Sequence, residues 1–70
     1  MKLVKHDDET RELIRSVGMR LGRVGGRVEE GSGGNLMVVF TEDRDADEAR
    51  RLVREQLDDC ADDWSERVEV

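Results

Sequence analysis

The chain has 70 residues and a formal net charge of −6, with 43% charged and 36% hydrophobic residues. This length fits a single domain, residues 1–70, and the periodic spacing of the hydrophobic residues excludes a disordered chain. No apolar stretch comes near the roughly 20 residues of a membrane helix, which excludes a membrane span, and a single cysteine excludes an internal disulfide.

The first third of the sequence predicts a strand followed by a helix. Residues 2–6 alternate loosely between polar and apolar side chains, which is typical of a short strand. Asp7-Asp8-Glu9 follows, and an aspartate is a good N-cap because its carboxylate accepts hydrogen bonds from free backbone N–H groups. The apolar residues of the helix then recur at spacings of three and four: Leu13, Ile14, Val17, Leu21 and Val24. Because glycine weakens a helix, we expect this one to fray near Gly22 and to end by Gly25-Gly26.

The apolar run Leu36–Phe40 is the strongest strand signal in the chain. It is too short for a separate helix, so residues 36–41 are expected to form a strand buried on both faces or nearly so. Residues 27–30 form a weaker candidate, and the glycine-rich residues 31–35 between them predict a turn. The two segments together predict a hairpin.

The last third predicts a helix and a final strand. Asp45 with Glu48 three residues later imitates a capping box at the start of the helix. The apolar face of this helix is expected to consist of Ala46, Ala49, Leu52, Val53, Leu57, Cys60 and Trp64. Residues 66–70 alternate between charged and apolar side chains, which is typical of a strand with one wet face.

The order strand, helix, strand, strand, helix, strand predicts an α+β fold. It resembles the ferredoxin-like βαββαβ arrangement, a four-stranded antiparallel sheet with two helices on one face. That arrangement places residues 2–6 and 36–41 in the centre of the sheet and the charged strands at its edges. We therefore expect residues 36–41 to pair with strands on both sides. The fold hosts many unrelated functions, so it does not by itself indicate an activity.

The sheet face away from the helices is the first candidate site. Strand alternation directs Leu3, Leu36, Val38, Phe40, Val68 and Val70 toward the helices. Val4, Met37 and Val39 would then face outward, in the middle of a charged rim. An apolar centre with a charged rim is typical of an association surface, and a partly wet sheet face is the plainer interpretation.

The arginine-glycine segment, residues 15–27, is the second candidate. Residues 13–28 hold four arginines and no acidic residue. Arg20, Arg23 and Arg27 with neighbouring glycines could approach phosphates, which indicates nucleic acid as an alternative partner. The plainer interpretation is that cations near a helix C-terminus complement the helix dipole. RNA-binding domains with this topology usually carry stacking aromatics on the central strands; here the only aromatics are Phe40 and Trp64, and neither is clearly placed to stack on a base.

The remaining polar features predict no chemistry. Four aspartates between Asp58 and Asp63 could hold a cation or a basic surface, but a solvated acidic end is the simpler interpretation. Cys60 lies on the apolar face of its helix and His6 is the only histidine, so no nucleophile with a base is indicated. We expect no catalytic residue, no cofactor and no metal.

The sequence therefore supports the hypothesis of a small non-enzymatic interaction module. It is expected to self-associate, as a homodimer, through its sheet face or edge, and to have no small-molecule substrate and no membrane partner. The alternative is a nucleic-acid-associated protein that uses residues 15–27. A third hypothesis is an acidic decoy that occupies a basic surface. A lone cysteine without a signal peptide favours a cytoplasmic setting.

Overall fold

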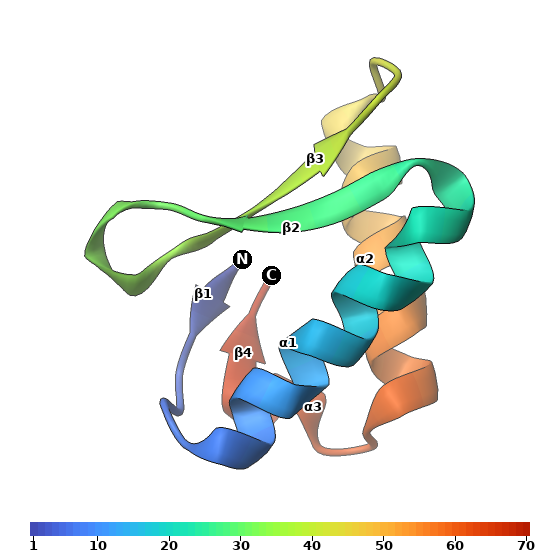
Figure 1. Ribbon diagram of the computed structural model, residues 1–70. Coiled ribbons are helices and arrows are strands. Elements are labelled where there is room, and N and C mark those ends of the chain that lie inside the picture. The colour runs from blue at the N-terminus through green and yellow to red at the C-terminus, as the bar shows by residue number, and fades with distance from the viewer.

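The computed structural model describes residues 1–70, except for the surroundings of Gly34. Its elements follow one another along the chain (Figure 1) as β1 (Lys2–Leu3), α1 (Asp8–Leu21), the 3-10 turn η1 (Gly22–Val24), β2 (Gly26–Glu30), the 3-10 turn η2 (Ser32–Gly34), β3 (Leu36–Phe40), α2 (Ala46–Cys60), α3 (Trp64–Arg67) and β4 (Val68–Glu69).

Helix α1 begins and ends where the sequence predicts. The Asp7 side chain caps it by accepting a hydrogen bond of 2.8 Å from the backbone N–H of Thr10. The regular helix ends at Leu21 and tightens into η1. Gly25 then takes a φ of 74°, a conformation that glycine adopts without strain and that turns the chain into β2.

Helix α2 begins as predicted but is shorter. The Asp45 side chain caps it by accepting from the N–H of Asp47 at 2.9 Å. Glu48 does not complete a capping box, because its carboxylate pairs with the Arg44 guanidinium at 2.7 Å. The prediction that the helix continues to Trp64 is wrong: α2 ends at Cys60, and Trp64 begins the separate short helix α3.

The strands form two separate two-stranded antiparallel sheets, β1 with β4 and β2 with β3. The predicted single four-stranded sheet, and with it the ferredoxin-like arrangement, is therefore wrong, although the structure is α+β. Between the sheets the structure describes one isolated antiparallel bridge, from Lys2 to Asn35, and two hydrogen bonds between Met1 and Leu36. Beyond Leu36, β3 is an edge strand on this side, contrary to the prediction that it pairs on both sides.

The short lengths of β1 and β4 explain why the sheet divides. After Leu3, the N–H groups of Val4 and Lys5 both donate to the carbonyl oxygen of Arg67, at 2.7 and 3.1 Å, and the chain turns toward α1. The predicted strand over residues 66–70 is reduced because its first two residues belong to α3. Strands of two residues are too short to extend along the five residues of β3.

The core lies between the two long helices and the inner faces of the strands. Helices α1 and α2 pack against each other, and the hairpin of β2 and β3 crosses over them (Figure 1). The buried apolar residues are Leu13, Ile14, Val17, Leu21, Val53, Leu57 and Val68. The predicted alternation of β3 is confirmed, since Leu36, Val38 and Phe40 pack against this core. Met37 points away and is 50% exposed, so the expectation that this strand is buried on both faces or nearly so is wrong.

Candidate protein-interaction surface

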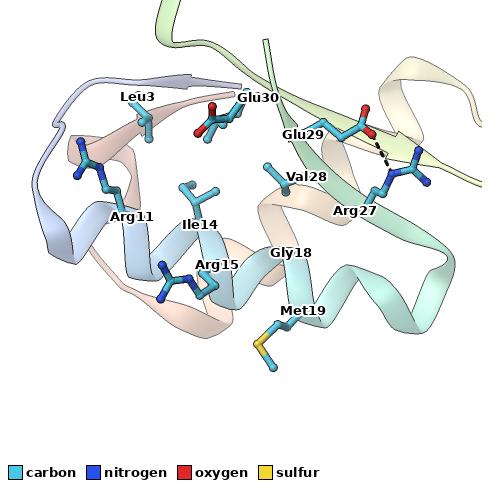
Figure 2. Close-up of a pocket in the computed structure, with 11 residues that line it drawn as sticks. Leu3, Arg11, Ile14, Arg15, Gly18, Met19, Arg27, Val28, Glu29 and Glu30 are labelled. Carbon is cyan, nitrogen blue, oxygen red and sulfur yellow. Dashed lines mark hydrogen bonds and ion pairs between the residues drawn. The ribbon is translucent and has the colours of Figure 1, made fainter.

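A groove of 570 Å³ lies between helix α1 and strand β2. Ile14 and Gly18 of α1 and Val28 of β2 form its apolar floor, and Leu3 adds to it (Figure 2). Leu36 also lines the groove. Gly18 lies directly under Val28, and a Cβ there would make an ordinary van der Waals contact with Val28 Cγ2 at 3.6 Å. Met19, which is 77% exposed, stands on the helix side of the groove.

The rim of the groove carries charges of both signs. Arg27 contacts Glu29 within β2, with 3.1 Å between its Nε and the Glu29 Oε1. On α1, Arg15 pairs with Glu12 at 2.6 Å, and Arg11 lies 3.8 Å from an acidic neighbour. These pairs are exposed, so each one contributes little to stability. The rim therefore offers charges that an incoming partner can engage.

The hydrogen bonds beside the hairpin ladder fix which backbone groups of β2 are free. The Thr41 N–H donates to the Gly25 carbonyl at 2.8 Å, just before the ladder, and the Gly31 N–H donates to the Asn35 carbonyl at 2.7 Å, just after it. In an antiparallel ladder, hydrogen-bonded pairs alternate with pairs that exchange no hydrogen bond. Positions 25 and 31 are therefore hydrogen-bonded positions, and so are 27 and 29 between them.

The backbone groups of Arg27 and Glu29 consequently point to β3, while those of Gly26, Val28 and Glu30 point away from it. We call these outward N–H and C=O groups the free edge of β2. In the described part of the chain no hydrogen bond engages them. All four residues from Arg27 to Glu30 line the groove. Because alternate side chains face opposite sides of a strand, a groove lined by consecutive residues runs along the backbone edge.

The three residues predicted for the open sheet face are not brought together in one patch. Met37 and Val39 share the outer face of the hairpin with Arg27 and Glu29, their neighbours across the ladder. Val4 is 54% exposed but lies after the end of β1. The bridge from Lys2 to Asn35 is antiparallel, so the chain runs from Lys2 to Val4 in the direction away from Met37.

The three arginines of the nucleic-acid alternative lie on three different elements, α1, η1 and β2. Arg20 lies 3.7 Å from Asp59 of α2, and Arg27 pairs with Glu29. Arg23 is exposed on η1. Acidic neighbours thus offset two of the three positive charges.

Three of the four aspartates of the acidic cluster have partners within the chain. Asp58 accepts a hydrogen bond of 2.6 Å from Trp64 Nε1, Asp59 lies near Arg20, and Asp63 pairs with Arg67 at 3.1 Å. Within the described residues, no three His, Cys, Asp or Glu side chains gather where they could hold a metal ion. Cys60 is a free cysteine that packs against the core.

Arg67 is the centre of a charged cluster that the sequence did not indicate. Its side chain is only 15% exposed and lies 2.9 Å from Glu9, 3.1 Å from Asp63 and 3.5 Å from Asp7. The spacing of four between Asp63 and Arg67 was the only local signal. The other contacts join residues far apart in sequence, and the expectation of a strand over residues 66–70 placed Arg67 beside the open sheet face.

This cluster also affects the start of α1. Hydrogen bonding from the side chain and the N–H of Thr10 holds the pKa of the Asp7 carboxyl below its ordinary value, and the positive charges of Arg67 and Lys5 lower it further. Burial acts to lower the pKa of Arg67, but the carboxylates of Asp63, Asp7 and Glu9 outweigh it and raise that pKa above its ordinary value. The ion pairs of this cluster hold α3 against the N-terminus of α1, so the role of the cluster is structural.

Comparisons of the chain with protein-family models, with curated proteins and with solved structures found no significant match. None of the helices described in the structure combines the length and the apolar character that crossing a membrane requires.

Proposed function

We propose that the protein is a small non-enzymatic interaction module that self-associates through the free edge of β2 and the groove beside it. The observation that supports this proposal is an unpaired strand edge that borders an apolar groove with a charged rim. An exposed strand edge is a template for pairing with another chain, in which backbone hydrogen bonds supply affinity and side-chain pockets supply specificity.

The free edge supports association better than the outer face of the hairpin does. On that face the apolar contribution comes from Met37 and the partly buried Val39, because Val4 lies elsewhere. The edge offers unpaired N–H and C=O groups, the exposed Met19 and the floor around Val28. A strand added there would satisfy the backbone groups and cover apolar surface at the same time.

Nucleic-acid binding remains an alternative prediction, with less support. Arg20, Arg23 and Arg27 lie on separate elements and two of them have acidic neighbours. Binding to nucleic acid weakens steeply with added salt, whereas association through a strand edge and apolar contacts does not, so a salt titration separates the two. For the setting of the protein, the single cysteine supports a cytoplasmic location as a proposal.

A proline substitution at the free edge tests the proposed function. The N–H of Glu30 points away from β3, so Glu30→Pro removes an outward donor and leaves the hairpin ladder intact. Light scattering over a range of protein concentrations is expected to show a wild-type dimer and a Glu30→Pro monomer with a near-native melt. The matched control is Glu30→Ala, which removes the carboxylate but keeps the N–H and is expected to remain a dimer. A wild type that stays monomeric at high concentration contradicts self-association.

A further inference from the structure

We propose that the strand that covers the free edge of β2 is β2 of a second copy, paired antiparallel around a two-fold axis that passes beside Val28. This inference rests on the proposed function and adds the occupant, its direction and its register. Three features of β2 carry it: the direction of its free backbone groups, the order of its charges, and the placement of its side chains relative to α1.

The free backbone groups permit a symmetric pairing at Val28. In an isologous dimer the same surface patch meets itself, so an antiparallel strand pair must place its central residue opposite the same residue of the other copy. Both the N–H and the C=O of Val28 point to the free edge. Two Val28 residues can therefore exchange two hydrogen bonds as a hydrogen-bonded pair.

The charge order of β2 is self-complementary in this register. With Val28 at the centre, Arg27 lies opposite Glu29 of the second copy, and Glu29 lies opposite its Arg27. These positions form pairs without backbone hydrogen bonds, in which the side chains approach most closely. Arg27 and Glu29 project on the same face of the strand and already meet within one copy at 3.1 Å. Pairing adds two opposite-charge contacts between the copies.

Neighbouring registers of the same symmetry lose this complementarity. A shift of the centre to Glu30 would set two glutamates directly opposite each other, which is destabilising. A shift to Gly26 would set Arg27 opposite Gly25 and remove both opposite-charge contacts. An axis at Arg27 or at Glu29, where the central pair exchanges no hydrogen bond, would set two arginines or two glutamates opposite each other. The sequence of β2 thus selects one register among those that its free backbone groups allow.

The side chains on the helix side suit a second copy of the same strand. Val28 faces α1 beside Gly18, so pairing sets two valines side by side above the groove (Figure 2). Met19 is the most exposed large apolar side chain of the described residues, at 77%, and it borders the same groove. The two hairpins would together form a continuous sheet in the order β3, β2, β2 and β3, which removes the unpaired edge.

Charge reversal tests the register. Arg27→Glu gives two acidic residues flanking Val28, and Glu29→Arg gives two basic residues, so each variant repels itself in the proposed pairing. Each variant is expected to raise the dissociation constant of the dimer about tenfold, as measured by sedimentation equilibrium at low salt. An equimolar mixture of the two variants is expected to dimerise again, because every acidic residue then faces a basic one. The double variant Arg27→Glu/Glu29→Arg is expected to dimerise like the wild type.

The controls separate this inference from the proposed function. Arg54→Glu makes the same change in charge on the exposed surface of α2 and is expected to leave the dissociation constant within about twofold. Thermal melts show whether each variant is folded, and the mixture requires only that both single variants fold. If the wild type dimerises and neither charge reversal changes its affinity, the proposed register is wrong, but self-association is not contradicted. The same holds if the mixture of the two variants fails to dimerise. A monomeric wild type overturns both.

Discussion

Trp64 shows how one side chain can anchor a chain reversal. It is partly buried, packs against the core after the end of α2, and donates from its indole N–H to Asp58. We expect Trp64→Ala to lower the free energy of unfolding by about 3 kcal/mol, because it removes a large aromatic from the core surface. Trp64→Phe keeps most of the packing and loses the hydrogen bond, at a cost of about 1 kcal/mol. Urea denaturation measures both values, and equal losses for the two variants would contradict a packing role.

Asp7 links stability to pH. Its pKa is lowered in the folded protein, chiefly by hydrogen bonding from Thr10, so the folded state prefers the ionised carboxylate. The contribution is therefore present above the unfolded pKa of about 4 and is lost as the pH falls through the lower folded value. Asp7→Asn keeps a cap but carries no charge. We expect the wild type to be more stable than this variant at pH 7, and the difference to vanish at acidic pH.

Thermal melts at stepwise pH check this expectation. Asp62→Asn is the matched control, because Asp62 is exposed and no ion pair of the described residues includes it. Its melting temperature is expected to follow that of the wild type at each pH. A gap between wild type and Asp7→Asn that stays constant from neutral to strongly acidic pH would show that the effect comes from the cap geometry and not from the charge.

At the scale of the elements, Val39→Asp distinguishes the edge of the hairpin from its outer face. Val39 lies on the outer face opposite Arg27, so an aspartate there gains an opposite charge across the ladder. We expect a loss of about 1 kcal/mol in stability from the removed apolar area. Dimer affinity, measured by light scattering, should stay within about threefold of the wild type. A folded Val39→Asp monomer would place the interface on the outer face instead.

The elements that the sequence predicts best are those defined by local signals. The start of α1 follows from Asp7, the start of α2 from Asp45, and the turn into β2 from Gly25. The alternation of Leu36–Phe40 fixed which side chains face the core. In each case the residues that determine the structure are neighbours in the chain, so a short stretch of sequence is enough to predict it.

The partition of the strands could not be predicted in the same way. It depends on how far β1 extends along β3, which is decided by hydrogen bonds from Val4 and Lys5 to Arg67, more than sixty positions away. Arg67 itself is held by acids at the start of α1. A pattern of alternating residues indicates that a strand can form, but it does not indicate which partner competes for its backbone.

The same limit applies to the candidate site. The sequence places residues 27–30 at the edge of a four-stranded sheet, whereas the free edge of β2 arises because its sheet has only two strands. The groove beside it could not be foreseen, because it arises from the tertiary placement of α1 at Gly18 against Val28. Association through an open sheet face required Val4 to join Met37, and the division of the sheet separates them.

At the scale of the whole molecule, the position of Val68 determines how cooperatively the protein unfolds. This residue is 1% exposed, yet it belongs to the two-residue strand β4 and shares the core with residues of α1 and α2. No contiguous half of the chain therefore contains a complete core. The pairing of Leu3 with Val68 brings together two residues near opposite ends of the chain. We expect the helices and the hairpin to be stable only when this pairing has formed, so that the protein unfolds in a single all-or-none step.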